Sequence, residues 1–238
     1  MMSSQRLRSF YNERRKKGPG LIALAIVGSI NWIVSDVLNF SALVSQLNID
    51  MSAFKQVANT LLPEFGLFGT LFVIALIGWL VDWDRLTRAI FFLANGIATF
   101  LVANYAFDLL FSLTKRSGNR DAAFLLIDAV LVWLMNLIVF TLWYWMLDRG
   151  GPDRRSTPRE RRRDWLFPQD QSAVEGWERW KPGFSDYLYA AFAYSASFGP
   201  NDTQMLSQRF KYLSMTQTML SLMVVVMIAA RAINLFTG

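Results

Sequence analysis

Long apolar runs that carry almost no charge constrain this chain more than any other feature of its sequence. Residues 21–40 form the first run, which follows a basic head and contains a single charged side chain, Asp36. An α-helix rises 1.5 Å per residue, so about 20 apolar residues cross the hydrocarbon core of a bilayer. A cleavable signal peptide has a shorter apolar core that ends in small residues. We therefore interpret this run as a retained membrane helix.

Further apolar runs of spanning length follow along the chain. They cover residues 65–82, about 89–113, about 122–147 and 212–236, whereas the apolar piece at 187–198 is too short to cross. Only 18% of the residues are charged, and soluble domains usually carry about 25%. The sequence therefore predicts an all-α membrane protein with about five transmembrane helices and one half-length segment before the last helix.

The basic residues predict how the chain is oriented. Lys and Arg collect in the cytoplasmic loops of membrane proteins. Here they are concentrated in the head (1–20), at Arg85 and Arg88 in a short turn, and in the linker (148–183). This pattern predicts a multi-pass protein of a bacterial inner membrane with a cytoplasmic N-terminus. It also assigns the net charge of +6 to cytoplasmic loops, so we expect no nucleic-acid partner.

Four segments follow from these boundaries. They are a basic cytoplasmic N-terminus (1–20), a four-helix transmembrane region (21–147), a basic cytoplasmic linker (148–183) and a C-terminal region (184–238). The head and the linker are expected to contact anionic lipid headgroups, which attract Lys and Arg. Three tryptophans lie among the charges of the linker, and we expect them to lie along the membrane surface. They are Trp165, Trp177 and Trp180.

The chain contains no Cys and no His. Disulfides, zinc sites with thiolate or imidazole ligands, and Ser-His or Cys-His nucleophile pairs are thereby excluded. No phosphate-binding loop, dinucleotide fingerprint or metal-binding helix pair is present in the sequence. We expect neither an enzyme nor a bound cofactor or metal ion.

The C-terminal region carries the main functional signal. A short apolar segment begins near Ser185 and Asp186, and the turn Gly-Pro-Asn-Asp at 199–202 separates it from the last spanning run. Irregular backbone at membrane depth is tolerated only where it is buried in protein or lines a water-filled cavity. The arrangement therefore predicts a re-entrant segment, the device by which channels present backbone carbonyls to ions.

This region resembles the pore region of two-helix potassium channels, in which D-x-L-Y and a pore helix precede the filter T-V-G-Y-G-D and an inner helix. Asp186, Leu188 and Tyr189 match the opening, residues 197–202 fall on the filter, and Arg231 falls near the end of the inner helix. The resemblance covers roughly the last fifty to sixty residues. The whole chain also resembles bacterial membrane proteins of unassigned function that carry a Phe-x-Pro-x-Asp turn.

The filter-like stretch departs from the potassium pattern. It keeps Gly199 and Asp202, but Asn201 replaces the second glycine and Pro200 replaces the aromatic residue. Proline fixes φ and lacks an N–H, so consecutive carbonyls cannot all point inward as in a potassium filter. The orientation also differs, because this segment would enter from the cytoplasm, as the pore loop of ionotropic glutamate receptors does. The alternative without a pore is a proline-containing turn that only connects an interfacial helix to the last span.

The resemblance implies a channel-like, ion-conducting protein, with a monovalent cation as the transported ion and a selectivity changed from potassium. A single pore loop cannot close a ring, so a homo-oligomer is expected. The alternative is a non-transporting scaffold or accessory subunit that binds a partner or anionic lipid. The predicted lining residues are Ser195, Ser197, Phe198, Gly199, Pro200, Asn201 and Asp202.

Charged residues inside the predicted spans form a second set of candidates. Such residues are costly in a bilayer and usually pair or serve transport. Asp36, Asp108 and Arg231 lie near the outer ends of their spans, and Asp128 lies two turns inside the fourth. We expect Arg231 to pair with Asp36 or Asp108, because an unpaired charge at this depth costs several kcal/mol.

Overall fold

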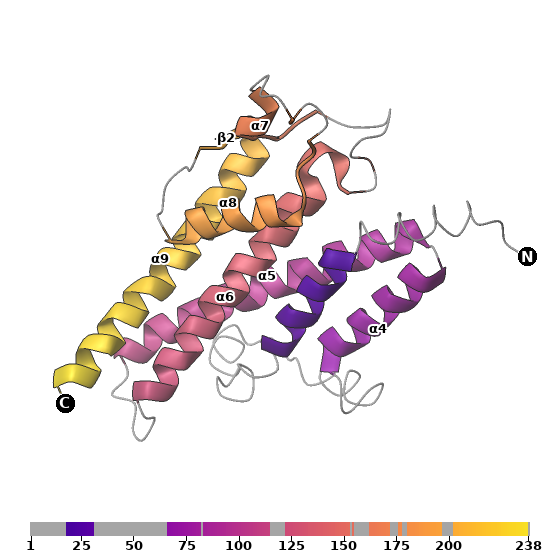
Figure 1. The fold of residues 1–238 in the computed structure, drawn as a ribbon. Coiled ribbons are helices and arrows are strands. Elements are labelled where there is room, and N and C mark those ends of the chain that lie inside the picture. The colour runs from indigo at the N-terminus through magenta and orange to yellow at the C-terminus, as the bar shows by residue number, and fades with distance from the viewer. Residues whose placement is uncertain are drawn as a thin grey trace, which may run out of the picture. The chain divides into compact units, whose positions relative to one another are not determined.

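The computed structural model describes residues 18–30, 66–81, 83–114, 122–152, 154, 162–171, 176–177, 180–196 and 202–237. These residues are almost entirely helical (Figure 1). A first helix, Gly18–Ile30, precedes the labelled elements. The others are α4 (Gly66–Val81), α5 (Asp84–Thr114), α6 (Ala122–Leu147), the 3₁₀ turn η1 (Asp148–Gly150), β1 (Trp165–Leu166), α7 (Pro168–Gln171), α8 (Phe184–Ala196), β2 (Gln204–Met205) and α9 (Gln208–Thr237).

Three of these helices are long and apolar enough to cross a membrane. The spanning stretches are Arg85–Phe111 in α5, Leu126–Gly150 from α6 into η1, and Gln208–Ala230 in α9. This confirms the predicted class of a helical protein with apolar helices of membrane-spanning length. The helix Gly18–Ile30 is shorter than a span, and the rest of the first apolar run lies outside the described residues. The total of five spans therefore stays a prediction.

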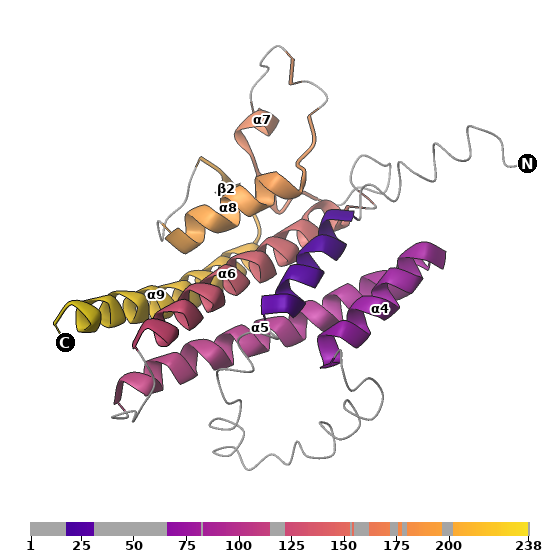
Figure 2. The same cartoon turned by 60° about the horizontal axis from the view of Figure 1, so that its bottom comes forward.

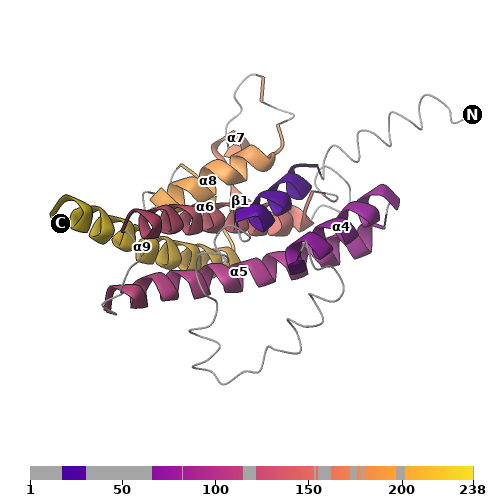
Figure 3. The same cartoon turned by 90° about the horizontal axis from the view of Figure 1, so that it is seen from below.

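Helices α4 and α5 form a tight pair, which is seen from below in Figure 3. The Trp83 N–H donates to the Gly78 carbonyl, and the Thr87 N–H donates to the Trp83 carbonyl. A Cβ atom at Gly78 would lie 2.7 Å from Thr87 Oγ1, so the close approach requires glycine. Arg85 and Arg88, predicted in a turn, lie in the first turns of α5 instead.

The chain divides into two compact units. The unit that we call the linker unit comprises the described parts of Met1–Ala23 and Leu137–Met219, and the other comprises those of Leu24–Asn136 and Leu220–Gly238. Helices α6 and α9 each run from one unit into the other. The linker unit therefore joins the polar linker, α8 and one end of two candidate spans into one folded body.

An aromatic core occupies the linker unit, with Trp165 at its centre. The Trp165 side chain is completely buried. Its ring centroid lies 4.6 Å from that of Tyr144 in α6 and 5.8 Å from that of Phe210 in α9. The expectation that Trp165 lies along the membrane surface was therefore wrong. Further rings around Trp165 are those of Phe167, Tyr187 and Tyr194.

Candidate functional site

The backbone turn that follows α6 begins the candidate site. Arg149 has a φ of 55°, and Gly150 and Gly151 follow with φ values of 81° and 91°. A Cβ atom at Gly151 would lie 2.8 Å from the Met146 carbonyl oxygen, so only glycine fits there. The left-handed conformation is unfavourable for a residue such as arginine. The ion pairs of the Arg149 side chain offset the free-energy cost of this backbone conformation.

Arg149 is completely buried between two carboxylates. Its Nε lies 3.3 Å from Asp148 Oδ2, and its Nη2 lies 2.5 Å from Asp170 Oδ2. Both carboxylate side chains are also withdrawn from solvent. The sequence predicts Arg149 as one of the basic residues of the linker, and the structure adds that its guanidinium is buried, which requires paired carboxylates. The three residues form a buried ionic cluster at the end of α6.

Asp148 links this cluster to the linker and to α8. Its Oδ1 accepts the backbone N–H groups of Asp164 at 2.8 Å and Trp165 at 3.2 Å. Its Oδ2 accepts the hydroxyl of Tyr187 in α8 at 2.5 Å. A carboxylate that accepts several hydrogen bonds and an ion pair is well compensated for its burial. One side chain therefore fixes three segments of the chain to one another.

A second ion pair connects the linker to α9. The Arg209 guanidinium binds the Asp164 carboxylate through two nitrogens, with Nε at 2.8 Å from Oδ1, and also donates to the Leu147 carbonyl. Next to this pair, β1 and β2 run antiparallel, with Trp165 opposite Met205. These bonds thus join the start of α9 to both the end of α6 and the linker.

Gln217 lies deeper in the same unit and is completely buried in α9. Its Oε1 accepts the Tyr144 hydroxyl of α6 at 2.6 Å. Its Nε2 donates to the Ala191 carbonyl and to Ser195 Oγ, both in α8 and both at 2.8 Å. The Gln217 amide therefore uses both ends and joins α6, α8 and α9. We call this group the Gln217 hub.

The short helix α8 is held at both of its ends. At the start, Asp186 accepts the Gly183 N–H at 2.7 Å and Tyr187 binds Asp148. At the end, Ser195 binds Gln217. The views of Figure 1 and Figure 2 both show α8 beside the adjoining parts of α6 and α9. Tyr194, next to Ser195 in α8, packs against Trp165, with ring centroids 6.0 Å apart.

The predicted lining residues have different environments. Ser195 is completely buried and faces α9 through the Gln217 hub. Asp202 is exposed, and the neighbouring Thr203 is buried. Residues 197–201, which include Ser197, Phe198, Gly199, Pro200 and Asn201, lie outside the described residues.

The predicted intramembrane charges are only partly described. Asp128 in α6 is buried, and Asp108 in α5 is half-buried. Asp108 Oδ2 accepts a hydrogen bond from Asn104 Nδ2 at 3.3 Å. Asp36 lies outside the described residues, and the side chain of Arg231 is not described either. The expected pairing of Arg231 therefore stays a prediction. Among the residues that the structure describes, no group of three acidic side chains is placed to hold a metal ion.

Sequence reasoning missed the residues that organise this site. Gln217 had a usable signal, because it is a polar residue inside an apolar span, and such residues usually have a specific role. Ser214 and Ser221, one turn on either side of it, are also buried, so they share its inward face. Asp148 and Asp164 gave no such signal, because the sequence does not distinguish them from the other charged residues of the polar linker.

No known protein family, curated protein or solved structure shows a significant match to this chain.

Proposed function

We propose that this protein is an ion-conducting channel of a bacterial inner membrane, in which α8 and the turn after it form a re-entrant pore loop. The observation that carries the proposal is the placement of α8. This 13-residue helix is too short to span, and buried polar bonds hold it from its first turn to its last against two helices of spanning length.

The bonding pattern supports a descent of α8 into the membrane. Tyr187 bonds at the level where Arg209 begins α9 beside Asp164. Eight residues further along each helix, Ser195 and Gln217 meet. Eight helical residues correspond to about 12 Å, which is less than half of a hydrocarbon core of about 30 Å. The chain then returns to β2, which pairs with β1 beside Asp164.

The direction of α8 favours a cation as the transported ion. The C-terminal end of a helix carries a partial negative charge from its unpaired carbonyl groups. In the proposed arrangement this end is the deeper one, because Ser195 bonds to Gln217, which lies about two turns into α9. The pathway that we propose is lined by the turn at 197–202, which ends at the exposed carboxylate of Asp202. In this proposal Ser195 holds the end of α8 in front of the turn through its bond to Gln217, and Pro200 and Asn201 give a selectivity that differs from potassium.

An ion pathway built from one short loop requires several subunits around an axis. The outward face of α9 offers a contact surface for a second copy, because most of its exposed residues from Tyr212 to Ile233 are apolar. Its most exposed apolar residues are Tyr212, Met215, Met219, Leu222, Val226 and Ile233. The same spacing places the inward residues Phe210, Val224 and Met227 against the chain itself.

Cysteine crosslinking tests this assembly directly, because the natural chain contains no Cys. We expect the M219C variant to form a disulfide-linked dimer when the protein is oxidised in lipid bilayers. The V224C variant is the matched control, since Val224 is completely buried, and it is expected to stay monomeric on denaturing gels. Equal crosslinking of both variants, or of neither, would contradict the proposed contact face.

Ion flux into liposomes that carry the purified protein tests conduction itself. We expect flux of potassium and sodium to rise with the amount of protein and to exceed that of chloride. The D202A variant is expected to lower cation flux at least tenfold, because it removes the carboxylate at the end of the turn. The Q204A variant, two residues away and also exposed, is expected to conduct like the natural protein. Protein that is folded and inserted but gives no flux above empty liposomes would argue against a channel.

A second candidate function is a non-transporting scaffold or accessory subunit. The specific observation in its favour is the burial of Ser195, whose hydroxyl is bound within the chain. In that case α8 would be a structural brace, and D202A would leave every transport assay unchanged. The crosslinking result would then show whether the brace belongs to an oligomer.

A further inference from the structure

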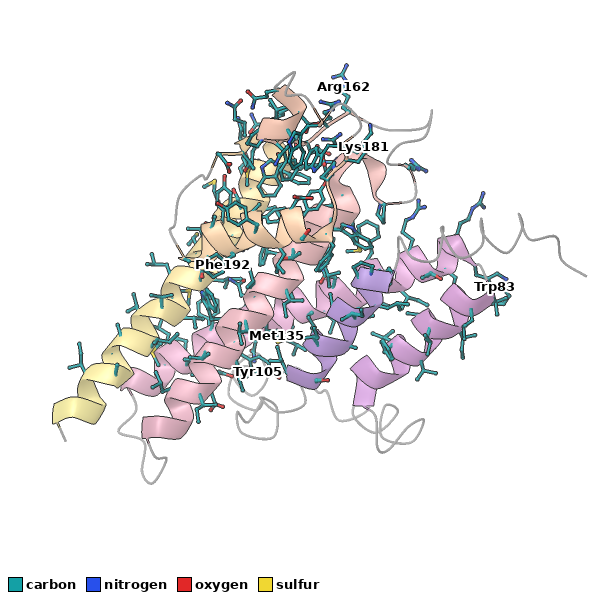
Figure 4. All side chains as sticks on the ribbon, in the orientation of Figure 1. Trp83, Tyr105, Met135, Arg162, Lys181 and Phe192 are labelled. Carbon is teal, nitrogen blue, oxygen red and sulfur yellow. The ribbon has the colours of Figure 1, made fainter. Side chains whose placement is uncertain are left out.

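The linker unit displays a surface that is both basic and aromatic. We call it the basic patch and define it by Arg162, Arg163, Trp177 and Lys181. Arg162 and Lys181 are exposed, and Figure 4 shows both side chains extending away from the ribbon at the linker end. Trp177 is 45% exposed, and the Arg163 side chain is 43% exposed. The linker unit thus exposes one tryptophan ring together with three cationic side chains.

The basic patch is fixed to the folded linker rather than carried on a loose loop. Arg163 Nη1 lies 3.2 Å from Asp170 Oδ1, and Asp170 is itself held by the buried Arg149. The Trp177 ring packs on Trp180 with centroids 6.4 Å apart. Trp180 in turn packs on Phe167, with centroids 5.5 Å apart. The position of the patch therefore follows that of the linker core.

The linker core sits directly on the ends of two candidate spans. One span ends at Gly150 and the other begins at Gln208. Asp148 binds the backbone at Asp164 and Trp165, and Arg209 binds the Asp164 side chain. These bonds hold the linker core beside the ends of the two candidate spans, where a bilayer that they cross would have its headgroup layer. Tryptophan is enriched at that level, because its ring is apolar and its N–H is polar.

We propose that the basic patch binds the headgroups of anionic phospholipids. The cations of Arg162 and Lys181 match the negative charge of such headgroups. The ring of Trp177, which is unfavourable in water, becomes favourable in the interfacial layer. An acidic protein would satisfy the charges alone, whereas the bilayer surface satisfies both the charges and the exposed ring. The proposal stands independently of ion conduction.

Lipid titration of the purified full-length protein tests this proposal. We would add phosphatidylglycerol or phosphatidylcholine to the protein in detergent and count the bound lipids by native mass spectrometry. Each basic residue near an anionic lipid surface contributes about 1 kcal/mol, which is a factor of about five in affinity. The R162Q/K181Q variant is therefore expected to lose roughly 25-fold in affinity for phosphatidylglycerol, with little change for phosphatidylcholine. The W177A variant is expected to bind both lipids more weakly.

The control variant R85Q/K211Q removes two exposed basic residues from other helix starts. We expect it to keep most of the preference for phosphatidylglycerol. An equal loss in this control would show a general effect of net charge and overturn the assignment to the patch. Binding of a polyglutamate peptide that R162Q/K181Q abolishes, without any preference for phosphatidylglycerol, would assign the patch to an acidic protein instead. Unchanged melting temperatures would show that all variants are folded.

Discussion

Replacing Asp148 by alanine is expected to destabilise the protein by about 3–5 kcal/mol, because it leaves the buried Arg149 with one carboxylate fewer. The same change removes the acceptor of the Tyr187 hydroxyl and of two backbone N–H groups. The linker and α8 would lose their common attachment to α6. The free energy of unfolding in detergent, measured by denaturant titration, gives the size of the effect.

Two variants make this measurement specific. Asp148→Asn keeps the size of the side chain and one carbonyl oxygen, so it is expected to lose less stability than D148A. Asp186→Ala removes an exposed hydrogen bond to the Gly183 N–H, which contributes about 1 kcal/mol. If D148A unfolded at the same denaturant concentration as D186A, the buried ionic cluster would contribute no more than a surface bond. That result would contradict the central place that we give to Asp148.

Replacing Gln217 by leucine is expected to abolish most ion flux while leaving α9 in the membrane. The change keeps a similar volume but removes the hydrogen bonds to Tyr144, Ala191 and Ser195. Side-chain hydrogen bonds between membrane helices contribute about 0.6 kcal/mol each, with a maximum near 1.7. A loss of about 2 kcal/mol in stability is therefore expected, and the end of α8 would no longer be held in position.

Two measurements separate positioning from stability in the Q217L variant. Cation flux is expected to fall at least tenfold, and amide hydrogen exchange is expected to accelerate in the last turn of α8. The control is Thr216→Val, because the exposed Thr216 hydroxyl bonds only within its own helix, to the Tyr212 carbonyl, in the contacts that the structure describes. Lower stability with natural flux and selectivity would show that Gln217 is purely structural. If the Q217L variant exchanged faster but the natural protein conducted no ions, Gln217 would still be shown to hold α8 in position. The proposed channel would then be rejected.

The helices were predictable because hydrophobic length is a property of the sequence alone. The run predicted at about 122–147 agrees with α6 (Ala122–Leu147). The short segment predicted at 187–198 is found as α8 (Phe184–Ala196), which begins three residues earlier, and residues 197 and 198 lie outside the described residues. A bilayer requires a fixed number of apolar residues, so counting them is enough to locate a helix.

The site was not predictable, because its contacts join residues that are far apart in the chain. Arg149 binds a carboxylate 21 positions away, Arg209 one 45 positions away, and Tyr144 reaches a side chain 73 positions away. Trp165 was placed on the surface because its neighbours are charged. Those charges have partners within the linker unit, and so the tryptophan between them is buried. Only the long-range pairing distinguishes such a segment from a solvated loop.

The two-ended attachment of α8 also determines when this part of the protein can mature during synthesis. Asp148, which holds its first turn, is made before α8, whereas Gln217, which holds its last turn, is made after it. A helix of this length is too short to be retained in the bilayer as a span. A nascent chain that has not yet reached Gln217 therefore carries α8 without its deeper anchor. Synthesis of α9 therefore supplies the second attachment of a segment that left the ribosome before it.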